Sequence, residues 1–359
     1  MTKNGYILSI DQGTTSSRAA LISEDGNIIS QKNIEFKQYF PNNGWVEHDP
    51  RDILSSTIDC IKYVINESNV KPEDIMTAGV TNQRETIVVW DKTSGDPVYN
   101  AIVWQDRRTE DICVSLREKN IEDLIQKKTG LLIDPYFSAS KIKWILENVD
   151  RAQSLIVDNN LLIGTIDTWL IWNLTNKRYH LTDVTNASRT MIYNIIDDCW
   201  DEELLKLFNI PREILPEVKN SMDNFGVISK DFFGSEIPIT GVAGDQQAAA
   251  FGQLCIKKGM IKSTYGTGCF MLMNTGKEVY QSQNKLLSTT AFKTNDQKMY
   301  ALEGSIFNAG TIVQWMRDEL TFFEKAGEIE ALASDAKNDI IFIPAFTGLG
   351  APYWDANAR

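Results

Sequence analysis

The chain opens with three short apolar runs whose alternation with polar positions is typical of β-strands, at residues 6–11, 17–22 and 27–36. A turn of Gly, Thr and Ser joins the first two runs. Runs of this length that flank a small-residue turn predict a β-hairpin. Residues 262–273 read KSTYGTGCFMLM and repeat the pattern around a Gly-Thr-Gly turn. The sequence therefore predicts two hairpins of one kind, far apart in the chain.

Other segments alternate between helical and strand-like spacing. Apolar residues at helical intervals predict helices over 50–66, 107–119, 138–148 and 201–208. Apolar runs bounded by turn residues predict strands over 75–81, 86–90 and 340–346. Segment 237–252 predicts a strand, a Gly turn and an Ala-rich helix, and segment 300–320 a strand, a turn and a helix. This alternation predicts an α/β fold with a mixed sheet opening each half.

Composition narrows the class of protein. With 359 residues the chain is too long for one ordinary core, so two domains are expected. A net charge of −12 argues against a general binder of nucleic acid or anionic membranes, because both need a basic face, but it allows a local basic pocket for phosphate. The five cysteines form no CxxC pair, and no signal peptide is visible, which predicts a reduced, cytoplasmic protein. Two histidines make a histidine metal site or a Ser-His-Asp hydrolase improbable on composition.

The hairpin turns are the first candidates for chemistry. Clustered backbone N–H groups and hydroxyls at a turn suit phosphate oxygens, and a nearby carboxylate such as Asp11 suits hydrated Mg²⁺. Either turn alone is best interpreted as an ordinary hairpin, but the pair favours two related halves that face a nucleotide. There is no GxxxxGK[ST] and no GxGxxG between a strand and a helix. The P-loop and Rossmann interpretations therefore lose their main support.

Ten longer motifs carry a family resemblance. They are DQGTTSSR (11–18), GWVEHDP (44–50), TNQRET (81–86), AIVWQDRR (101–108), DPYFSASK (134–141), DTWLIWNLT (167–175), TNASRTM (185–191), GDQQAAAFGQ (244–253), YGTGCFMLMNTG (265–276) and PAFTGLGAPYWD (344–355). In this order and spacing the chain resembles the glycerol kinases, carbohydrate kinases of the actin-like ATPase superfamily. The resemblance covers essentially the whole chain. It implies an actin-like, ribonuclease H-like fold with a mixed five-stranded sheet flanked by helices in each of two related domains.

The resemblance also implies an activity and the residues of its acceptor site. These kinases transfer the γ-phosphoryl group of ATP, with Mg²⁺, to a terminal hydroxyl of glycerol, giving sn-glycerol 3-phosphate. Asp245 matches the catalytic base, and a carboxylate can take the proton of the attacking hydroxyl. The matching substrate contacts, together with Asp245 itself, are Arg84, Glu85, Tyr136, Gln246, Trp104 and Phe270. The local sequence alone would instead indicate a helix cap for Asp245, a solvated surface pair for Arg84 and Glu85, and core positions for the three aromatic residues.

The nucleotide site is matched in the same way. The first phosphate loop corresponds to Thr14, Thr15, Ser16 and Arg18, the second to Thr267, and later nucleotide contacts to Gly310 and Gln314. Asp11 corresponds to the Mg²⁺ site, with binding through water. A guanidinium such as that of Arg18 compensates charge on a transferring phosphoryl group. A helix-packing role explains Gly310 equally well from the local sequence.

The chain departs from the family in two places. It stops at Arg359, where family members continue, which predicts a complete first domain over 1–253 and a truncated second domain over 254–359. On this view the adenine side is incomplete, glycerol binds without tight ATP binding, and the full-length protein is a homo-oligomer. Loop 230–237 reads KDFFGSEI, with Asp231 where some members carry a phosphorylatable histidine. Inhibition by fructose 1,6-bisphosphate is not expected, because the loop has no arginine.

Two alternatives stay open at this stage. One is a related kinase that acts on a pentulose or on gluconate, and the other is a nucleotide-binding fragment of the actin-like fold without catalysis. The Arg84–Glu85 pair with Trp104 and Phe270 favours a small triol, and the QRE and GDQQ motifs favour a kinase.

Overall fold

A six-stranded sheet forms the centre of the first half of the chain. The computed structural model describes residues 5–337 and 341–358. The strand order is β13-β14-β5-β1-β2-β3, with β1, β2 and β3 antiparallel and β5 parallel to both β1 and β14. The bounds are β1 Tyr6–Gln12, β2 Ser16–Ser23, β3 Ile28–Glu35, β5 Ile75–Asn82, β13 Val227–Ile228 and β14 Ile237–Gly244.

Helices α1 (Pro50–Ser68) and α6 (Ile166–Leu174) cover this sheet. The sequence sets the bounds of α1, because the Asp49 carboxylate caps its first turn through the Arg51 N–H and Asn69 ends it in a left-handed conformation. Its apolar face, with Ile53 and Ile61 fully buried, packs on β2 and β3. Helix α6 is mostly apolar and almost fully buried, as expected of a helix enclosed within a core.

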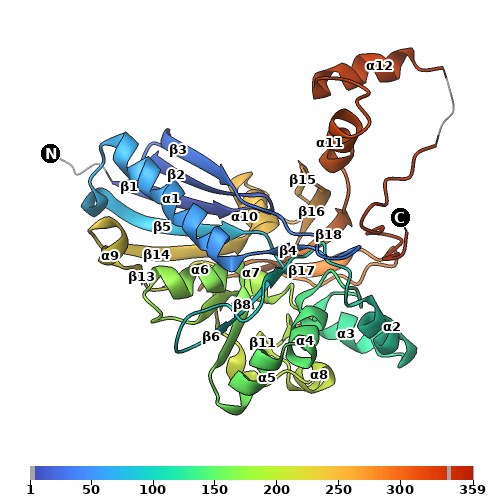
Figure 1. Cartoon of the computed structure of the whole chain (residues 1–359), viewed down its shortest axis with the longest axis horizontal. Coiled ribbons are helices and arrows are strands. Elements are labelled where there is room, and N and C mark those ends of the chain that lie inside the picture. The colour runs from blue at the N-terminus through green and yellow to red at the C-terminus, as the bar shows by residue number, and fades with distance from the viewer. Residues whose placement is uncertain (1–4, 338–340, 359) are drawn as a thin grey trace.

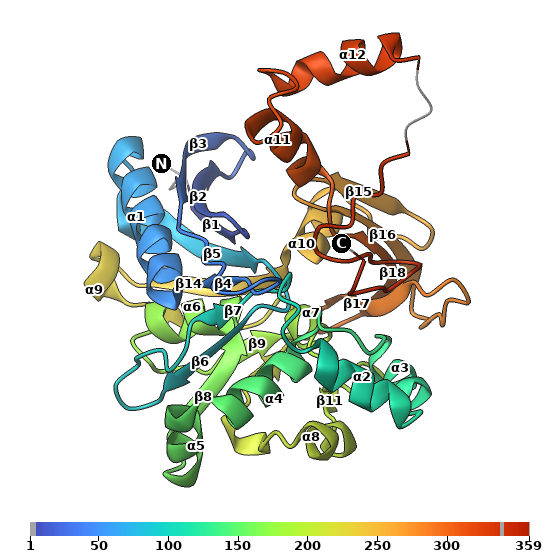
Figure 2. The same cartoon turned by 45° about the vertical axis from the view of Figure 1, so that its right-hand side comes forward.

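An inserted region lies below this sheet in Figures 1 and 2. It has a second sheet in the order β4-β7-β6-β8, two small strand pairs and a group of helices. The strands are β4 Glu47–His48, β6 Ile87–Asp91, β7 Ala101–Ile102, β8 Leu161–Thr165, β9 Leu181–Asp183, β10 Tyr193–Asn194, β11 Cys199–Trp200 and β12 Glu217–Lys219. Its helices are α2 Glu110–Glu118, α3 Glu122–Thr129, α4 Ser138–Asn148, α5 Asp150–Val157, α7 Val184–Ala187 and α8 Glu202–Phe208, with a short 3-10 turn at Arg212–Ile214. Outside this region, helix α9 (Lys230–Phe233) lies between β13 and β14, and a 3-10 turn at Pro72–Asp74 precedes β5.

The first half ends with helix α10 (Asp245–Gly252), which lies between the two halves (Figure 2). An antiparallel sheet follows in the order β15-β16-β18-β17. Its strands are β15 Ile261–Tyr265, β16 Cys269–Gly276, β17 Leu287–Lys293 and β18 Lys298–Ile306. Then come α11 (Gly310–Asp318), a 3-10 turn (Ala326–Glu328) and α12 (Ile329–Asp335), which stand away from the sheets (Figure 1).

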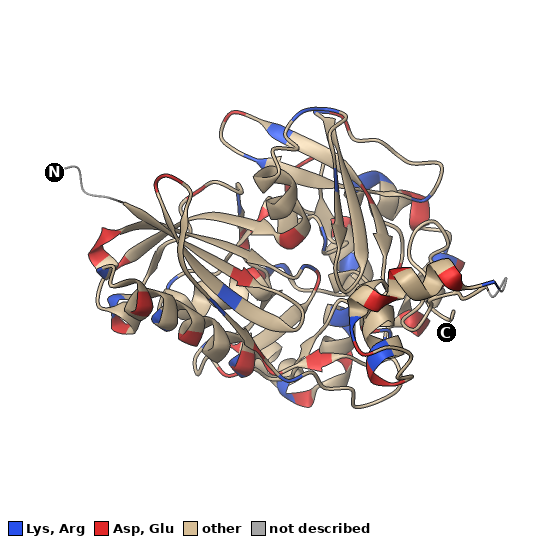
Figure 3. Cartoon of the chain, turned by 90° about the horizontal axis from the view of Figure 1, so that it is seen from above, with Lys and Arg blue, Asp and Glu red and all other residues tan. Residues whose placement is uncertain are grey.

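One hydrophobic core runs from the inserted region into the second half. It joins Tyr136 and Met191 with Phe270, Leu287 and Phe307. Charged residues of both signs are interspersed over the outer elements (Figure 3). Within residues 5–337 and 341–358, no helix is both long and apolar enough to cross a membrane.

The predicted α/β fold is confirmed, with three corrections. The first sheet has the five expected strands plus the two-residue edge strand β13. The described second sheet has four strands where five were predicted, and it is antiparallel rather than mixed. The strand predicted over 340–346 is wrong in its described part, since residues 341–345 form no strand and Phe346 makes only an isolated bridge to Gly348. Residue 340 lies outside the described residues.

Candidate active site

The first hairpin turn connects β1 to β2 and is braced from behind. The Gly13 N–H donates to the Ser16 carbonyl at 2.9 Å, which closes the turn. The Gly13 carbonyl accepts from the side-chain amides of Gln12 (2.7 Å) and Gln83 (3.1 Å). Both glutamines are buried; Gln12 is the last residue of β1 and Gln83 directly follows β5. The backbone of Gly13 is therefore hydrogen-bonded through both its N–H and its carbonyl.

The second hairpin turn connects β15 to β16 and is braced by α11. The Gly266 N–H donates to the Gly268 carbonyl at 2.9 Å. The carbonyls of Gly266 and Thr267 accept from the N–H groups of Gly310 and Ala309, each at 2.9 Å. A Cβ on Gly310 would lie 2.6 Å from the Gly266 carbonyl oxygen, so only glycine allows this approach. In this structure Gly310 packs against the turn itself.

Both turns line one pocket of about 380 Å³. Asp11, Gly13 and Thr14 come from the first hairpin, and residues 264 and 266–268 from the second. The rest of the lining comes from the segment after β5, the aromatic residues of the inserted region, α10 and β16, namely Arg84, Glu85, Trp104, Tyr136, Asp245, Gln246, Ala249 and Phe270. The two turns and Asp245 thus meet at a single crevice.

Arg84 and Glu85 follow directly after β5. Glu85 has a φ of +63°, a left-handed conformation that is rare for a residue with a side chain. Its carbonyl accepts from the Ser138 hydroxyl at 3.0 Å, and its carboxylate from Arg189 Nε at 2.5 Å. Unusual backbone conformations that the surroundings enforce are frequent at functional sites. Here the conformation lets two consecutive residues both line the pocket.

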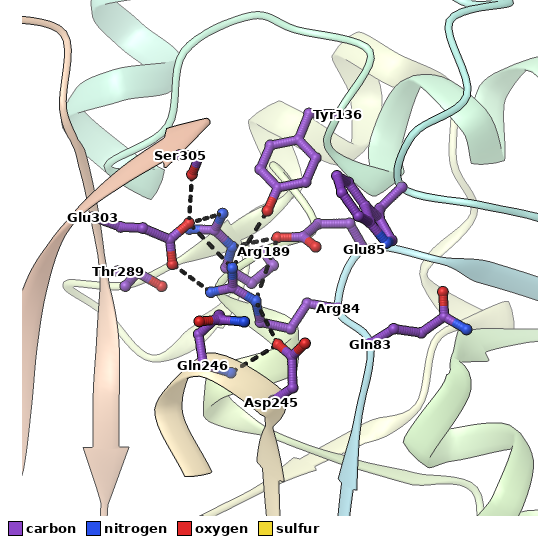
Figure 4. Close-up of polar contacts among 12 residues, drawn as sticks. Gln83, Arg84, Glu85, Tyr136, Arg189, Asp245, Gln246, Thr289, Glu303 and Ser305 are labelled. Atoms are coloured by element: carbon purple, nitrogen blue, oxygen red, sulfur yellow. Dashed lines mark hydrogen bonds and ion pairs between the residues drawn. The ribbon is translucent and has the colours of Figure 1, made fainter. Parts of the chain in front are cut away.

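Arg84, Glu85, Arg189 and Glu303 form a buried ion cluster (Figure 4). Glu303 accepts from both terminal nitrogens of Arg84, at 2.6 and 3.1 Å, and from Arg189 Nη2 at 2.8 Å. Burial raises the pKa of Glu303, but the guanidiniums of Arg189 and Arg84 outweigh it and hold the pKa at about 2. For Glu85 burial outweighs the same two arginines, and its pKa is raised.

Asp245 is the first residue of α10 and faces the pocket. Its carboxylate accepts from the Gln246 N–H at 2.7 Å and lies 3.4 Å from Arg84 Nε. Its side chain is 36% exposed, through the pocket. Burial raises the pKa of Asp245, although Arg84 acts against this. Gly244 before it leaves room for Arg84, since a Cβ there would lie 2.6 Å from Arg84 Cγ and Cδ.

Three aromatic residues form the apolar wall of the pocket. The Trp104 ring meets Tyr136 and Phe270 edge to face, at centroid distances of 5.7 and 5.9 Å. The Tyr136 hydroxyl accepts from Arg84 at 3.3 Å. Trp104 Nε1 donates to the Thr14 hydroxyl at 3.0 Å, which links the wall to the first hairpin turn.

The structure places the other predicted residues outside this lining. Thr15 and Arg18 are exposed beyond the first turn, with Arg18 opposite Asp11 in the β1–β2 register. Ser16 ends that turn, Gly310 lies behind the second turn, and Gln314 is exposed on α11. Sequence reasoning missed Glu303 and Arg189. One signal was available for Glu303, a lone acid in the apolar run of β18.

The pocket offers carboxylate oxygens for a cation. No group of three or more His, Cys, Asp or Glu suited to a metal occurs among residues 5–337 and 341–358. Asp11 and Asp245 are the carboxylates of the lining besides Glu85. Burial raises the pKa of Asp11 and Arg18 lowers it less, so a cation would favour its charged form. A donor set this small fits Mg²⁺, which keeps several waters and takes one or two carboxylates beside phosphate oxygens.

Comparison with known proteins gives a consistent result. Residues 6–252 match the N-terminal domain of the FGGY family of carbohydrate kinases, and residues 261–359 match its C-terminal domain. The chain is 56% identical over 356 residues to a glycerol kinase of Petrotoga mobilis and to glycerol kinase 2 of Thermotoga maritima. Each alignment covers 99% of this chain and 72% of the relative.

Solved structures show the same likeness. A glycerol kinase of Plasmodium falciparum, solved with ADP, matches with a TM-score of 0.88 at 40% identity, over 99% of this chain and 72% of that one. A gluconate kinase of Lactobacillus acidophilus matches with a TM-score of 0.84 at 24% identity, over 99% and 71% of the two chains. The second match shows only that the fold is shared.

Proposed function

The chain belongs to the FGGY family of carbohydrate kinases, with glycerol kinases as relatives at more than half identity, and we propose on this premise how it phosphorylates glycerol with ATP. The product is sn-glycerol 3-phosphate. One observation supports the assignment of the site. Both hairpin turns, the Arg84–Glu85 pair and Asp245 line a single pocket, so a polyphosphate on the turns would present its terminal group to an acceptor beside Asp245.

The acceptor side of the pocket suits a small triol. Arg84 has only donors and Glu85, when ionised, only acceptors, so together they satisfy neighbouring hydroxyls. Trp104 and Phe270 give the carbon chain an apolar surface, and Tyr136 and Gln246 add polar contacts at its edge. The aromatic wall limits the length of the acceptor.

Asp245 is the proposed general base. It lies at the pocket end of α10 and is oriented by the Gln246 N–H and by Arg84. A carboxylate placed there takes the proton of the attacking hydroxyl as the bond to phosphorus forms. The hydroxyl oxygen displaces ADP from the γ-phosphorus, and the proton stays on Asp245 until product leaves.

The nucleotide side is assigned to the hairpin turns. Thr14 and Thr267 line the pocket, and Thr15, Ser16 and Arg18 continue the first turn, where donors and a guanidinium compensate phosphate charge. Gly310 and Gln314 extend the site along α11. Asp11 would hold Mg²⁺ through water, and the ion when bound neutralises charge on the β- and γ-phosphates.

The test is glycerol-dependent ADP release, with glycerol 3-phosphate identified as the product. Direct binding of glycerol and of ATP to the chain is measured alongside, so that loss of a ligand site is separated from loss of chemistry. We expect Asp245→Asn to lower turnover by about 10²–10⁴-fold with little change in glycerol affinity, as for a general base. Asp59→Asn, on the exposed face of α1, is the matched control.

Two results would contradict the proposal. Near-normal turnover of Asp245→Asn removes Asp245 from the role of base. In a panel of polyols, pentuloses and gluconate, a strong preference for a larger acceptor removes glycerol as the substrate.

A further inference from the structure

Two residues of the buried ion cluster touch the acceptor site without lining it. Glu303, on β18, holds both terminal nitrogens of Arg84, and Arg189, after α7, holds one carboxylate oxygen of Glu85. Glu303 and Arg189 are themselves fully buried and bonded to each other. The pocket lining includes Arg84 and Glu85 but neither of these partners.

We propose that Glu303 and Arg189 are positioning residues for the acceptor, acting through Arg84 and Glu85; this inference rests on the proposed function. A carboxylate that takes two N–H groups of one guanidinium fixes its plane. Glu303 therefore sets the direction in which Arg84 Nε and the remaining N–H bonds point. Arg189 donates to one oxygen of Glu85, Oε1, which leaves the second oxygen to accept from a hydroxyl of the acceptor.

The charges of the cluster support the same role. Its two guanidiniums and two carboxylates neutralise one another, which suits an uncharged ligand. Without Glu303, the two arginines would compete for Glu85, since both lie within 4 Å of its carboxylate. Both contacts are to Glu85 Oε1, so this competition would turn the carboxylate and move its second oxygen, which the acceptor needs.

Glu303 is also the one member of the cluster that comes from the second half of the chain. Other contacts hold the halves together beside it: the hydroxyls of Ser188 and Thr289 lie 2.9 Å apart, and the Gln247 amide donates to the Thr290 carbonyl at 3.2 Å. The first half supplies the polar glycerol ligands, and the second half supplies the carboxylate that orients one of them.

The test compares Glu303→Gln with Glu47→Gln. Glu47 is equally buried and bonded to Arg108 at 2.7 Å, but lies outside the pocket, so it controls for the loss of a buried ion pair. We expect Glu303→Gln to raise the glycerol dissociation constant and KM by about 10–100-fold, with a smaller change in kcat and none in the KM for ATP. Glu47→Gln should leave all four values within about twofold.

A second measurement separates positioning from general damage. Propane-1,2-diol and propane-1,3-diol each lack one hydroxyl of glycerol. If Glu303 acts by orienting Arg84, the diol that lacks the hydroxyl bound by Arg84 should bind wild type and Glu303→Gln with almost equal affinity. The preference for glycerol over that diol should then be lost in Glu303→Gln. An equal weakening of all three ligands overturns the proposal.

If Glu303→Gln does not fold, Ser305→Ala serves instead, because the Ser305 hydroxyl donates to Glu303 at 2.9 Å. Its expected effect is a rise of about 2–10-fold in the glycerol dissociation constant. An unchanged glycerol constant in a folded Glu303→Gln, or in Ser305→Ala where that stands in, overturns the inference while the proposed function stands. If the unsubstituted chain neither binds nor phosphorylates glycerol, both fall.

Discussion

Asp245, the proposed general base, depends most on its surroundings, because the proposed role needs a charged carboxylate and burial disfavours the charge. Arg84 Nε at 3.4 Å and the Gln246 N–H at 2.7 Å stabilise the carboxylate. Burial still outweighs them, and the pKa of Asp245 is raised above the ordinary value of 3.8. A base whose pKa lies closer to the working pH transfers protons more effectively.

This raised pKa predicts an acidic limb in the pH dependence of turnover. As the pH falls through the raised pKa, Asp245 takes up a proton before an ordinary aspartate would, and the base is lost. Titration of the Asp side-chain carboxyl carbons by NMR measures the pKa directly, with the Asp245 signal identified by its absence in Asp245→Asn. A midpoint at or below 3.8 would contradict the expectation.

The residues that line the proposed acceptor site are easier to find in the sequence than the residues that hold them in place. Arg84, Glu85 and Asp245 stand at the ends of strands or the start of a helix, within motifs that local sequence makes visible. Glu303 lies 219 residues from Arg84, and nothing local to β18 says which cation it meets. Such a pairing arises only when the two halves of the chain pack.

At the scale of elements, each hairpin turn depends on a neighbour that comes from elsewhere in the chain. Gln83 at the end of β5 braces the first turn, and the start of α11 braces the second. The strands on either side are predictable from alternation, since β1, β2, β15 and β16 fall within a few residues of the expected bounds. The hydrogen bonds that support the two turns are not predictable in this way, because they join residues far apart in the sequence.

The missing strand at 341–345 has a physical reason. Phe342 and Phe346 pack on Trp315 of α11, with ring centroids 6.1 and 4.9 Å away. Part of their apolar surface therefore rests on a helix, and no neighbouring strand pairs with this segment among the described residues. Phe342 and Ile343 remain 45% and 66% exposed, so this apolar run forms neither a strand nor a buried segment.

The brace on the second turn predicts the effect of Gly310→Ala. The new Cβ would lie 2.6 Å from the Gly266 carbonyl oxygen, so the turn and α11 must separate. We expect the ATP dissociation constant to rise by about tenfold, from overpacking at a backbone contact, while glycerol binding is unchanged. Gly327→Ala is the control, since no atom lies within 4 Å of its Cβ position. Equal ATP affinity in both variants would mean that the turn does not need this contact.

At the scale of the whole molecule, the buried ion cluster joins the two halves beside the proposed acceptor site. Removing one partner of a buried pair is costly because it leaves an uncompensated charge, and Glu303 has two partners. The same contact that orients Arg84 thus also contributes to global stability. We therefore expect Glu303→Gln to weaken glycerol binding and to lower the stability of the fold at the same time. The pH dependence of the stability shows whether the charge of Glu303 or the shape of its side chain is responsible.

The pKa of Glu303 is lowered from 4.5 to about 2 in the folded protein, so its charge stabilises the fold above pH 4.5. That contribution is lost as the pH falls from 4.5 towards 2, where wild type also carries a protonated, uncharged side chain. We therefore expect Glu303→Gln to lower Tm by roughly 5–10 °C at pH 7, and the difference from wild type to shrink steadily below pH 4.5. Thermal unfolding at pH 7, 5, 4 and 3 measures this, with Asp59→Asn as a control that should follow wild type throughout. A gap that stays constant down to pH 3 would mean that the shape of the Glu303 side chain, and not its charge, holds the two halves together, and the orientation of Arg84 would then need another explanation.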